Sequence, residues 1–216
     1  MLLPSAFTQQ RFNAGVVLGA NFAQIDGDYQ FGFHKKGIMT GARAIAYLNP
    51  WLEMNIDLLY SQRGAKQSYR KNPIVAIDLN YVESVFLLNF KIPAKGDLEK
   101  DPKGRKKKQL NEFRPFHLQL GVSYGRLVNS TVSTGNAPRS PFLPQLEVSF
   151  QEMREHFNRN DLSVVPGVSY FFSRNIGVTF HAYFPTRSLY DKEQFPDRIS
   201  RSMRSFFYSL QLAYLL

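Results

Sequence analysis

Residues 203–216, which close the sequence, alternate between two kinds of side chain. The even positions from Phe206 to Leu216 are large and apolar, whereas the odd positions between them are mostly small and neutral. A period of two predicts a β-strand with one apolar face. A strand in a water-facing sheet would normally carry charged residues on its other face. Small neutral residues instead fit the crowded interior of a narrow barrel, whose apolar outer face would then meet lipid.

Seven further segments alternate in a similar way, which gives eight expected strands. We place them at 12–22, about 38–48, 51–63, about 75–92, 116–125, 162–172, 176–184 and 206–216. Most are long enough to cross a bilayer at the usual tilt, which takes about 9–11 residues. In the fourth segment the apolar parity changes near Tyr81–Glu83, which predicts a bulge or two unequal halves. For the second segment, the sequence does not decide which face points inward.

The connections between these segments alternate in length. Those after the first, third, fifth and seventh strands are long, while those after the second and sixth are tight turns at 49–50 and 173–175. Long external loops and short periplasmic turns are typical of outer-membrane barrels. The connection 95–112 departs from this pattern, because it is long and would be periplasmic. The insertion 129–160 contains a stretch, 151–157, that is compatible with a short helix.

These patterns predict an all-β fold, an eight-stranded antiparallel up-and-down transmembrane β-barrel with long external loops. The soluble alternative is a lipocalin-type barrel, in which the apolar faces point inward around a ligand. Its outward faces should be charged, and here they would be glycine, serine, asparagine, glutamine and threonine. We therefore favour the membrane barrel, located in the outer membrane of a Gram-negative bacterium.

Composition is consistent with one barrel domain over 11–216. Residues 1–10 look like the remnant of a signal peptide or a disordered N-terminus, with Ala6–Thr8 as a small-x-small cleavage site. The chain of 216 residues has no cysteine and no apolar run near the roughly 18 residues of a membrane-spanning helix. A mean hydropathy of -0.29 does not exclude a membrane barrel, because half of each strand faces inward.

The formal net charge of +10 raises the possibility of nucleic-acid binding. Much of the excess, however, lies in a few connections, above all Lys103–Lys108, rather than on a continuous groove or helix face. We therefore expect no nucleic-acid partner. The run is most simply a solvated loop, and its functional alternative is contact with an acidic periplasmic protein or with lipid phosphates. The residues that would make this contact are Lys103, Arg105, Lys106, Lys107 and Lys108.

Several charged residues share the expected inward face. Glu53 and Asp57 are four positions apart on one strand, about 13 Å, which is too far for a shared proton. With Glu83 from the next strand and Arg43 they are expected to form a buried ionic network in the lumen, since unpaired charges there are costly. The functional alternative is a path for protons or ions.

His117 and His181 have the same inward parity but lie on the fifth and seventh strands, which are not adjacent. No third ligand accompanies them at a metal-site spacing, so we predict no metal site and no cofactor. Hydrogen bonds from these histidines to Gln119 or Tyr183 are the simpler expectation.

The chain resembles the PorT family of outer-membrane β-barrels from Bacteroidota-type bacteria. The similarity is carried by the opening 19–28, the Asn-Pro-Trp-Leu turn followed by 58–64, the segment 79–83, and the strand 116–124. It extends over essentially the whole chain from Arg11, although 95–112 and 129–160 do not fit the family pattern. The resemblance implies an outer-membrane barrel. The namesake's link to protein secretion and gliding does not transfer on barrel similarity alone.

The sequence therefore favours an integral outer-membrane barrel with a filled lumen that acts as a binding or scaffold protein of the cell envelope. Its expected partners are outer-membrane lipid and, in one alternative, periplasmic or secretion-machinery proteins. That alternative is an accessory component of a secretion or gliding apparatus. A small lipid-modifying enzyme is the less favoured alternative, because nothing in the sequence pairs Ser130 or Ser188 with a particular histidine. We predict that the protein is not an enzyme.

Overall fold

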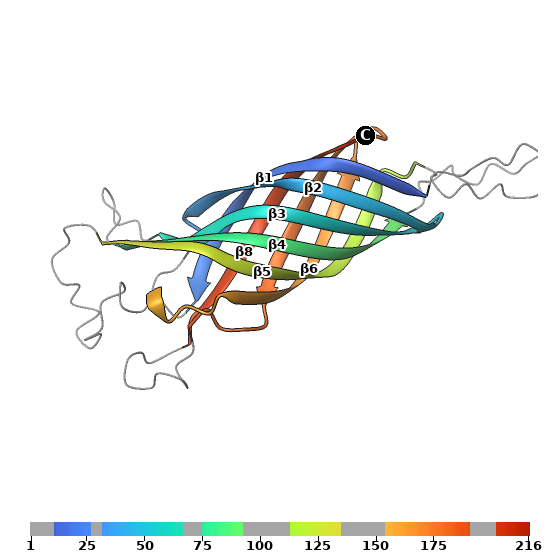
Figure 1. The fold of residues 1–216 in the computed structure, drawn as a ribbon. Helices are drawn as coiled ribbons and strands as arrows, with labels where there is room; N and C mark the ends of the chain where they lie inside the picture. Colours follow the sequence, from blue (N-terminus) through green and yellow to red (C-terminus); the bar gives the residue numbers. More distant parts are fainter. Residues whose placement is uncertain (1–10, 27–31, 67–74, 93–112, 135–153, 191–201) are drawn as a thin grey trace, which may run out of the picture.

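The computed structural model describes residues 11–26, 32–66, 75–92, 113–134, 154–190 and 202–216. In these ranges eight antiparallel strands follow one another around a closed barrel, and the last strand pairs with the first (Figure 1). They are β1 (Phe12–Asp26), β2 (Lys35–Asn49), β3 (Leu52–Lys66), β4 (Val75–Ile92), β5 (Phe116–Thr134), β6 (Asn160–Phe171), β7 (Ile176–Pro185) and β8 (Arg204–Leu215). The predicted eight-stranded up-and-down barrel is confirmed.

The two ends of the barrel differ, and we name them by their connections. The turn end holds the start of β1, the end of β8 and the tight β2–β3 and β6–β7 turns, and it lies at the right in Figure 1. The opposite, loop end is where β1, β3, β5 and β7 finish. Both ends of the barrel sheet, Phe12 and Leu215, therefore lie at the turn end, as an even number of antiparallel strands requires.

The closing strand β8 has the faces that its alternation predicts. Ser209, Gln211 and Ala213 are buried inside the barrel, whereas Leu210 and Leu212 are 50% and 49% exposed on its outside. In the seam with β1, Gly19 lies opposite Gln211 and Val17 opposite Ala213. The inward side chains on both sides of this seam are therefore small or slender, which lets β1 and β8 pair closely and complete the barrel.

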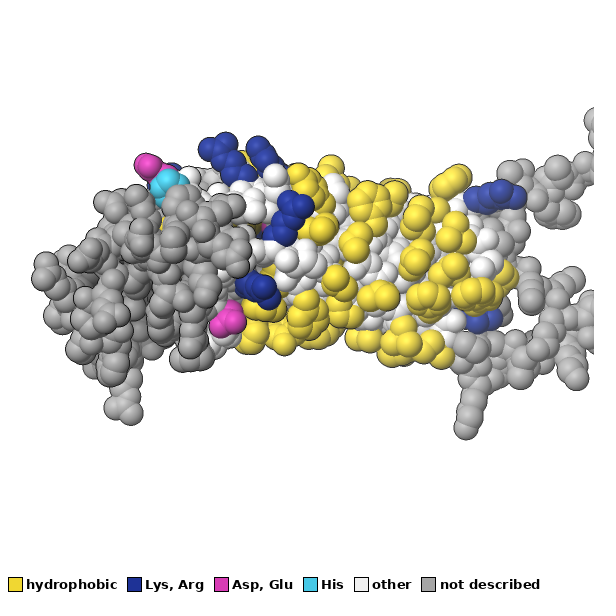
Figure 2. Space-filling view, turned by 90° about the horizontal axis from the view of Figure 1, so that it is seen from below, with side chains coloured by type: hydrophobic (Ala, Val, Ile, Leu, Met, Phe, Trp, Pro, Cys, Tyr) yellow, Lys and Arg dark blue, Asp and Glu magenta, His cyan; other side chains and the backbone are white. Residues whose placement is uncertain are grey.

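Large apolar side chains cover the outside of the barrel. Figure 2 shows them as a broad band, with lysine and arginine side chains near both of its edges. On β5, for example, Leu118, Leu120 and Val122 are exposed while the residues between them are turned inward. An apolar exterior around a polar interior is the arrangement of a barrel that faces lipid rather than water.

At the loop end this distribution is reversed, with apolar residues on the inner face of the strand and polar residues on the outer face. The inward residues of β4 keep odd parity along the whole strand, from Ile77 to Lys91. At the loop end they are apolar, and the outward Asp78 and Asn80 are polar. The parity change near Tyr81–Glu83 therefore marks two unequal halves of one regular strand, with the apolar residues moving from the outer face to the inner face.

An extra residue does occur at this level, but on β5 rather than β4. Asn80 pairs with Asn129 and Tyr81 with Leu127, so Val128 has no partner and forms the bulge. Of the two alternatives predicted for this parity change, the bulge on β4 is therefore wrong, whereas the two unequal halves are observed. The bulge also shifts the inward parity of β5, since Ser123 is buried before it and Ser130 and Val132 after it.

Three other expectations need correction or completion. β5 continues to Thr134, into the region expected to be a loop insertion. β2 turns Arg43 and Ile45 inward and Ala42 and Ala44 outward, which the sequence left open. Of the expected helix 151–157, the described part shows helical geometry only at Arg154–Glu155. In the described ranges, no helix is both long and apolar enough to cross a membrane.

Candidate functional site in the barrel interior

Charged side chains are buried in the barrel interior in three groups. β3 supplies one member of each group, in the order Glu53, Asp57 and Arg63 from the turn end towards the loop end. Each of the three is at most 2% exposed. Burial of this degree requires an opposite charge nearby, because an isolated charge in a low-dielectric interior costs several kcal/mol or more.

The central group is a two-residue ion pair between neighbouring strands. Arg43 on β2 lies directly opposite Asp57 on β3. Its Nε donates to Asp57 Oδ1 at 2.8 Å and its Nη2 to Oδ2 at 2.7 Å. This two-pronged geometry matches the planar guanidinium to both carboxylate oxygens and fixes the orientation of both side chains.

The group nearer the loop end places one cation between two carboxylates. Arg63 Nη2 lies 3.3 Å from Glu83 Oε1 on β4 and 2.9 Å from Asp161 Oδ2 on β6. Its guanidinium also stacks over the Tyr81 ring, 3.7 Å from the centroid. The positive charge is thus enclosed by two anions and a π-face, both of which attract it.

A glycine creates the space for this group. Glu83 pairs with Gly125, and Gly125 pairs with Asp161, so the three residues form one row across β4, β5 and β6. A Cβ atom at Gly125 would lie 3.1 Å from Arg63 Nη2. The missing side chain in the middle of the row therefore leaves room for the guanidinium between the two acids.

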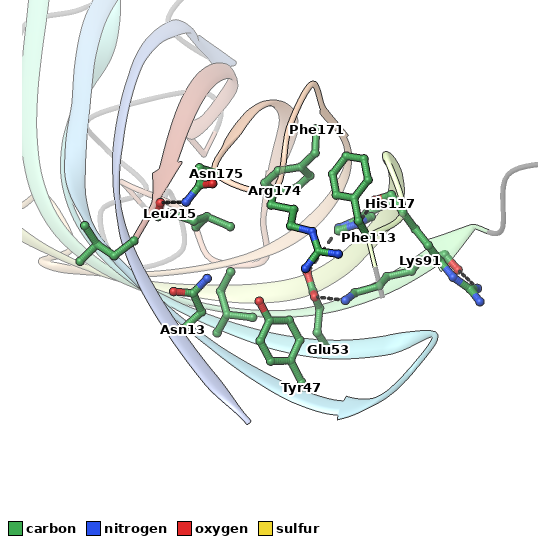
Figure 3. A pocket seen from close by; sticks show the side chains of 13 residues that line it. Asn13, Tyr47, Glu53, Lys91, Phe113, His117, Phe171, Arg174, Asn175 and Leu215 are labelled. Carbon is green, nitrogen blue, oxygen red and sulfur yellow. Dashed lines mark hydrogen bonds and ion pairs between the residues drawn. The ribbon is translucent and has the colours of Figure 1, made fainter. Parts of the chain in front are cut away.

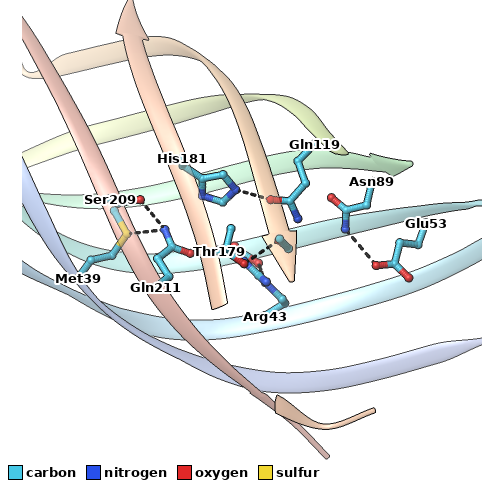
Figure 4. A network of polar contacts seen from close by, with 11 residues as sticks. Met39, Arg43, Glu53, Asn89, Gln119, Thr179, His181, Ser209 and Gln211 are labelled. Carbon is cyan, nitrogen blue, oxygen red and sulfur yellow. Dashed lines mark hydrogen bonds and ion pairs between the residues drawn. The ribbon is translucent and has the colours of Figure 1, made fainter. Parts of the chain in front are cut away.

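A second glycine likewise allows a contact between two strands that are not neighbours. Gln119, Gly167 and His181 form a row across β5, β6 and β7. His181 Nε2 and Gln119 Oε1 are 2.7 Å apart (Figure 4). Because a Cβ at Gly167 would collide with the His181 ring, the contact depends on that glycine.

The third group lies at the turn end around Glu53. Lys91 Nζ is 2.8 Å from Glu53 Oε2, while His117 Nδ1 is 3.3 Å from Oε1. Asn89 Nδ2 donates to the same Oε1 at 3.2 Å. His117 Nε2 is 2.8 Å from the Arg114 carbonyl oxygen, to which it can only donate. Three groups from β4 and β5 therefore surround this one carboxylate.

A cavity of about 200 Å³ opens beside the Glu53 group at the turn end (Figure 3). Its polar lining comes from the turn residues Arg174 and Asn175 and from five other residues, which are Asn13, Glu53, Lys91, Arg114 and His117. Aromatic and aliphatic side chains, including Tyr47, Phe113 and Phe171, complete the wall. This lining combines positive charge, amides and apolar surface in one concave site, which is the usual composition of a small-molecule pocket.

The opposite end of the interior is filled by apolar side chains. The strands contribute Ile25, Ala65, Ile77, Leu79, Tyr81 and Val132, and the segments outside them contribute Phe157, Leu189, Tyr190 and Met203. The latter segments are tied together by backbone bonds from Asn158 N to the Leu189 oxygen and from Leu189 N to the Met203 oxygen. This apolar cluster thus lies at the loop end of the interior and meets the Arg63 group at Tyr81.

The structure brings some of the residues singled out in the sequence together and separates others. Arg43 and Asp57 form a pair, and Glu53 contacts His117, whereas Glu83 and His181 belong to different groups. The charges therefore form three local sets and not one network with Glu53, Asp57 and Glu83 together. Lys103, Arg105, Lys106, Lys107 and Lys108 lie outside the described residues, as do residues 1–10.

Sequence reasoning missed Arg63, Lys91 and Asp161. Arg63 has the same parity as Asp57 on β3, and Lys91 the same parity as Glu83 on β4, so strict counting could have found both. Asp161 is the second residue of β6 and lies one residue before the expected start of that strand. No group of three or more potential metal ligands occurs in the described ranges. Ser130 is buried on β5 and Ser188 follows β7.

Comparisons with known proteins add little to this geometry. No protein-family model matches the sequence, and no curated protein matches it either. Similar solved structures include the attachment invasion locus protein Ail of Yersinia pestis, at 11% identity over 96% of this chain and 100% of that one, with a TM-score of 0.47. Neisserial surface protein A is 15% identical over 93% of this chain and 96% of its own, with a TM-score of 0.46. The outer membrane protein OprG of Pseudomonas aeruginosa is 10% identical over 95% and 94%, with a TM-score of 0.37. Likeness at this level carries no functional information, which has to come from the chain itself.

Proposed function

We propose that this protein is an integral β-barrel of the outer membrane that acts as a binding or scaffold protein and does not conduct solutes. The observation that carries the proposal is the combination of an apolar exterior with a filled, charge-paired interior. The exterior suits lipid, and a barrel of this size encloses only enough space for its own side chains. The apolar cluster at the loop end further supports a closed barrel.

Orientation follows from the same reasoning. In outer-membrane barrels the short turns face the periplasm and the long loops face outward. The turn end, with its cavity, would therefore open to the periplasm. The PorT-family resemblance agrees with this location, although the family itself stays a prediction.

Two measurements test the proposal. The folded full-length chain, extracted with the membrane fraction, is expected to migrate differently on a gel before and after boiling. In planar lipid bilayers it is expected to produce no stable conductance steps. Recovery in the soluble fraction with unchanged mobility would refute the membrane assignment, and regular conductance steps would refute the non-conducting role.

The accessory role in secretion or gliding rests on the basic stretch 103–108, which lies outside the described residues. Nothing in the described part of the chain favours it over a general binding role, and the partner contact stays a prediction. Deleting 103–108 and comparing co-purified proteins would test it, because unchanged partners would contradict docking through this stretch. The lipid-modifying enzyme gains no support from Ser130, because this serine lies near the loop end of β5, whereas His117 lies near the turn end of the same strand and His181 contacts Gln119.

A further inference from the structure

We propose that Arg126 and Asn160, on the outer face of the barrel, bind the phosphate group of an anionic lipid. The inference deepens the binding role proposed above by naming a surface and a class of ligand, and it rests on the membrane location proposed there. The two residues lie opposite each other on the neighbouring strands β5 and β6, at the loop end. With the long loops facing outward, this lipid would belong to the outer leaflet.

The outer face changes from apolar to polar at the loop end of every strand. On β5, for example, Tyr124 is 48% exposed, and the next outward residue is Arg126. The residues at this first position beyond the apolar side chains are Gln24, Lys36, Gln62, Asn80, Arg126, Asn160, Thr186 and Arg204. They include three cations and no acid. Cations that follow an exposed aromatic residue in this way are suited to the level of the lipid headgroups.

Arg126 has only neutral neighbours across the ladder. It lies between Val82 on β4 and Asn160 on β6. The acid next to Asn160 in sequence, Asp161, contacts Arg63 inside the barrel and is therefore already paired. Among the described residues, none of the ion pairs includes Arg126. Its positive charge is therefore not balanced by the part of the chain that the structure describes.

Asn160 holds the guanidinium of Arg126 in place without neutralising it. Arg126 Nη1 donates to Asn160 Oδ1 at 2.6 Å, and the Tyr124 hydroxyl donates to the same oxygen at 3.1 Å. The acceptor is an amide oxygen, so the arginine is oriented while its full charge stays available. Most of the five N–H donors of the guanidinium and both N–H donors of the Asn160 amide also remain for an incoming anion.

This geometry favours phosphate, and its position favours a lipid. The planar guanidinium can donate two parallel hydrogen bonds to phosphate oxygens, which a lysine cannot do. Directly beside the site, towards the middle of the barrel, Val122 and Leu162 are 47% and 36% exposed on the outer face. Acyl chains attached to the bound phosphate would lie along these side chains. A free phosphate ion would gain nothing from them.

The test uses the refolded full chain in an uncharged maltoside detergent. The probe is a short-chain phosphatidic acid, and the matched compound without net charge is phosphatidylcholine with the same chains. Binding is followed by the chemical shifts of the backbone amides of 122–126. We expect phosphatidic acid to bind at least tenfold more tightly than phosphatidylcholine. Equal affinity for the two lipids would overturn the proposal, and inorganic phosphate that binds as tightly as phosphatidic acid would overturn the assignment to lipid.

The key variant is Arg126→Gln. Its matched control, Arg204→Gln, removes an exposed arginine from the same edge, where Asp26 lies opposite it across the seam of β1 and β8. We expect R126Q to weaken binding of phosphatidic acid about tenfold and R204Q to weaken it less than about twofold. Equal effects of the two variants would show a general attraction between charges and would overturn the site.

A third variant separates the position of the arginine from its charge. Asn160→Ala keeps every charge but removes the acceptor that orients Arg126, so we expect it to weaken binding about threefold. Unchanged binding in N160A would refute the positioning role of Asn160. Gel mobility without boiling shows that each variant is folded. Because the titration requires neither a bilayer nor a conductance measurement, its failure is distinguishable from failure of the proposed function.

Discussion

Arg43 and Asp57 form a buried ion pair in which two hydrogen bonds, at 2.8 Å and 2.7 Å, join side chains that face each other across β2 and β3. Both side chains are at most 1% exposed. Substitutions in this pair therefore measure what it costs to bury a charge in the barrel interior. Breaking it and replacing it are expected to have very different consequences.

We expect Asp57→Asn to destabilise the barrel by about 3–5 kcal/mol, because it leaves the Arg43 charge buried without a counter-charge. The double variant Arg43→Met/Asp57→Leu removes both charges and should recover most of that loss. Urea unfolding in detergent micelles, followed by the fluorescence of Trp51, the single tryptophan, measures both. Equal unfolding midpoints for D57N and the unaltered chain would contradict this account.

Arg63 should be more important for stability than either of its acidic partners. Arg63→Met leaves Glu83 and Asp161 facing each other without a cation, which should cost about 3–5 kcal/mol. Glu83→Gln keeps Asp161 at 2.9 Å from Arg63 and should cost only about 1–3 kcal/mol. The same unfolding assay ranks the two variants. A larger effect for E83Q would show that Asp161 does not compensate the arginine.

The glycine rows predict that two similar substitutions behave differently. At Gly167 an added Cβ would collide with the His181 ring and lie 2.9 Å from the Phe180 carbonyl oxygen. Gly167→Ala should therefore cost about 1–3 kcal/mol through overpacking. At Gly125 the nearest atoms are 3.1 Å or more away and belong to side chains, so Gly125→Ala should cost less. Equal losses in urea unfolding would argue against the proposed role of Gly167.

The reversal of polarity at the loop end predicts where lipid contact stops. Leu120 and Val128 both point outward from β5, with 55% and 65% exposure, but only Leu120 lies in the middle of the apolar band. Leu120→Arg should cost about 2–4 kcal/mol in a lipid bilayer, and Val128→Arg about 0–1 kcal/mol. Folding into lipid vesicles, scored by gel mobility without boiling, compares the two. Similar losses for both variants would place the lipid boundary beyond Val128.

Alternation along the chain was sufficient to predict the strands, because the direction of each side chain is a local property of extended backbone. It also predicted the inward face of β8 from Ser209, Gln211 and Ala213. The end of β5 was missed because the bulge at Val128 interrupts the period, and a local pattern cannot distinguish a bulge from the end of a strand. The parity change on β4 was visible in the sequence. It arises because the surroundings of the strand change along the barrel axis.

The sequence by itself thus determined the number of strands and the inward face of most of them. Only the tertiary structure decided which charges meet, because the register and tilt of the closed sheet set the distances between strands. Arg63 reaches Asp161 across the row that contains Gly125, and His181 reaches Gln119 across Gly167. Such contacts depend on a missing side chain on a third strand, which no local pattern in the chain can reveal. The apolar cluster at the loop end and the cavity at the turn end follow from the same long-range packing.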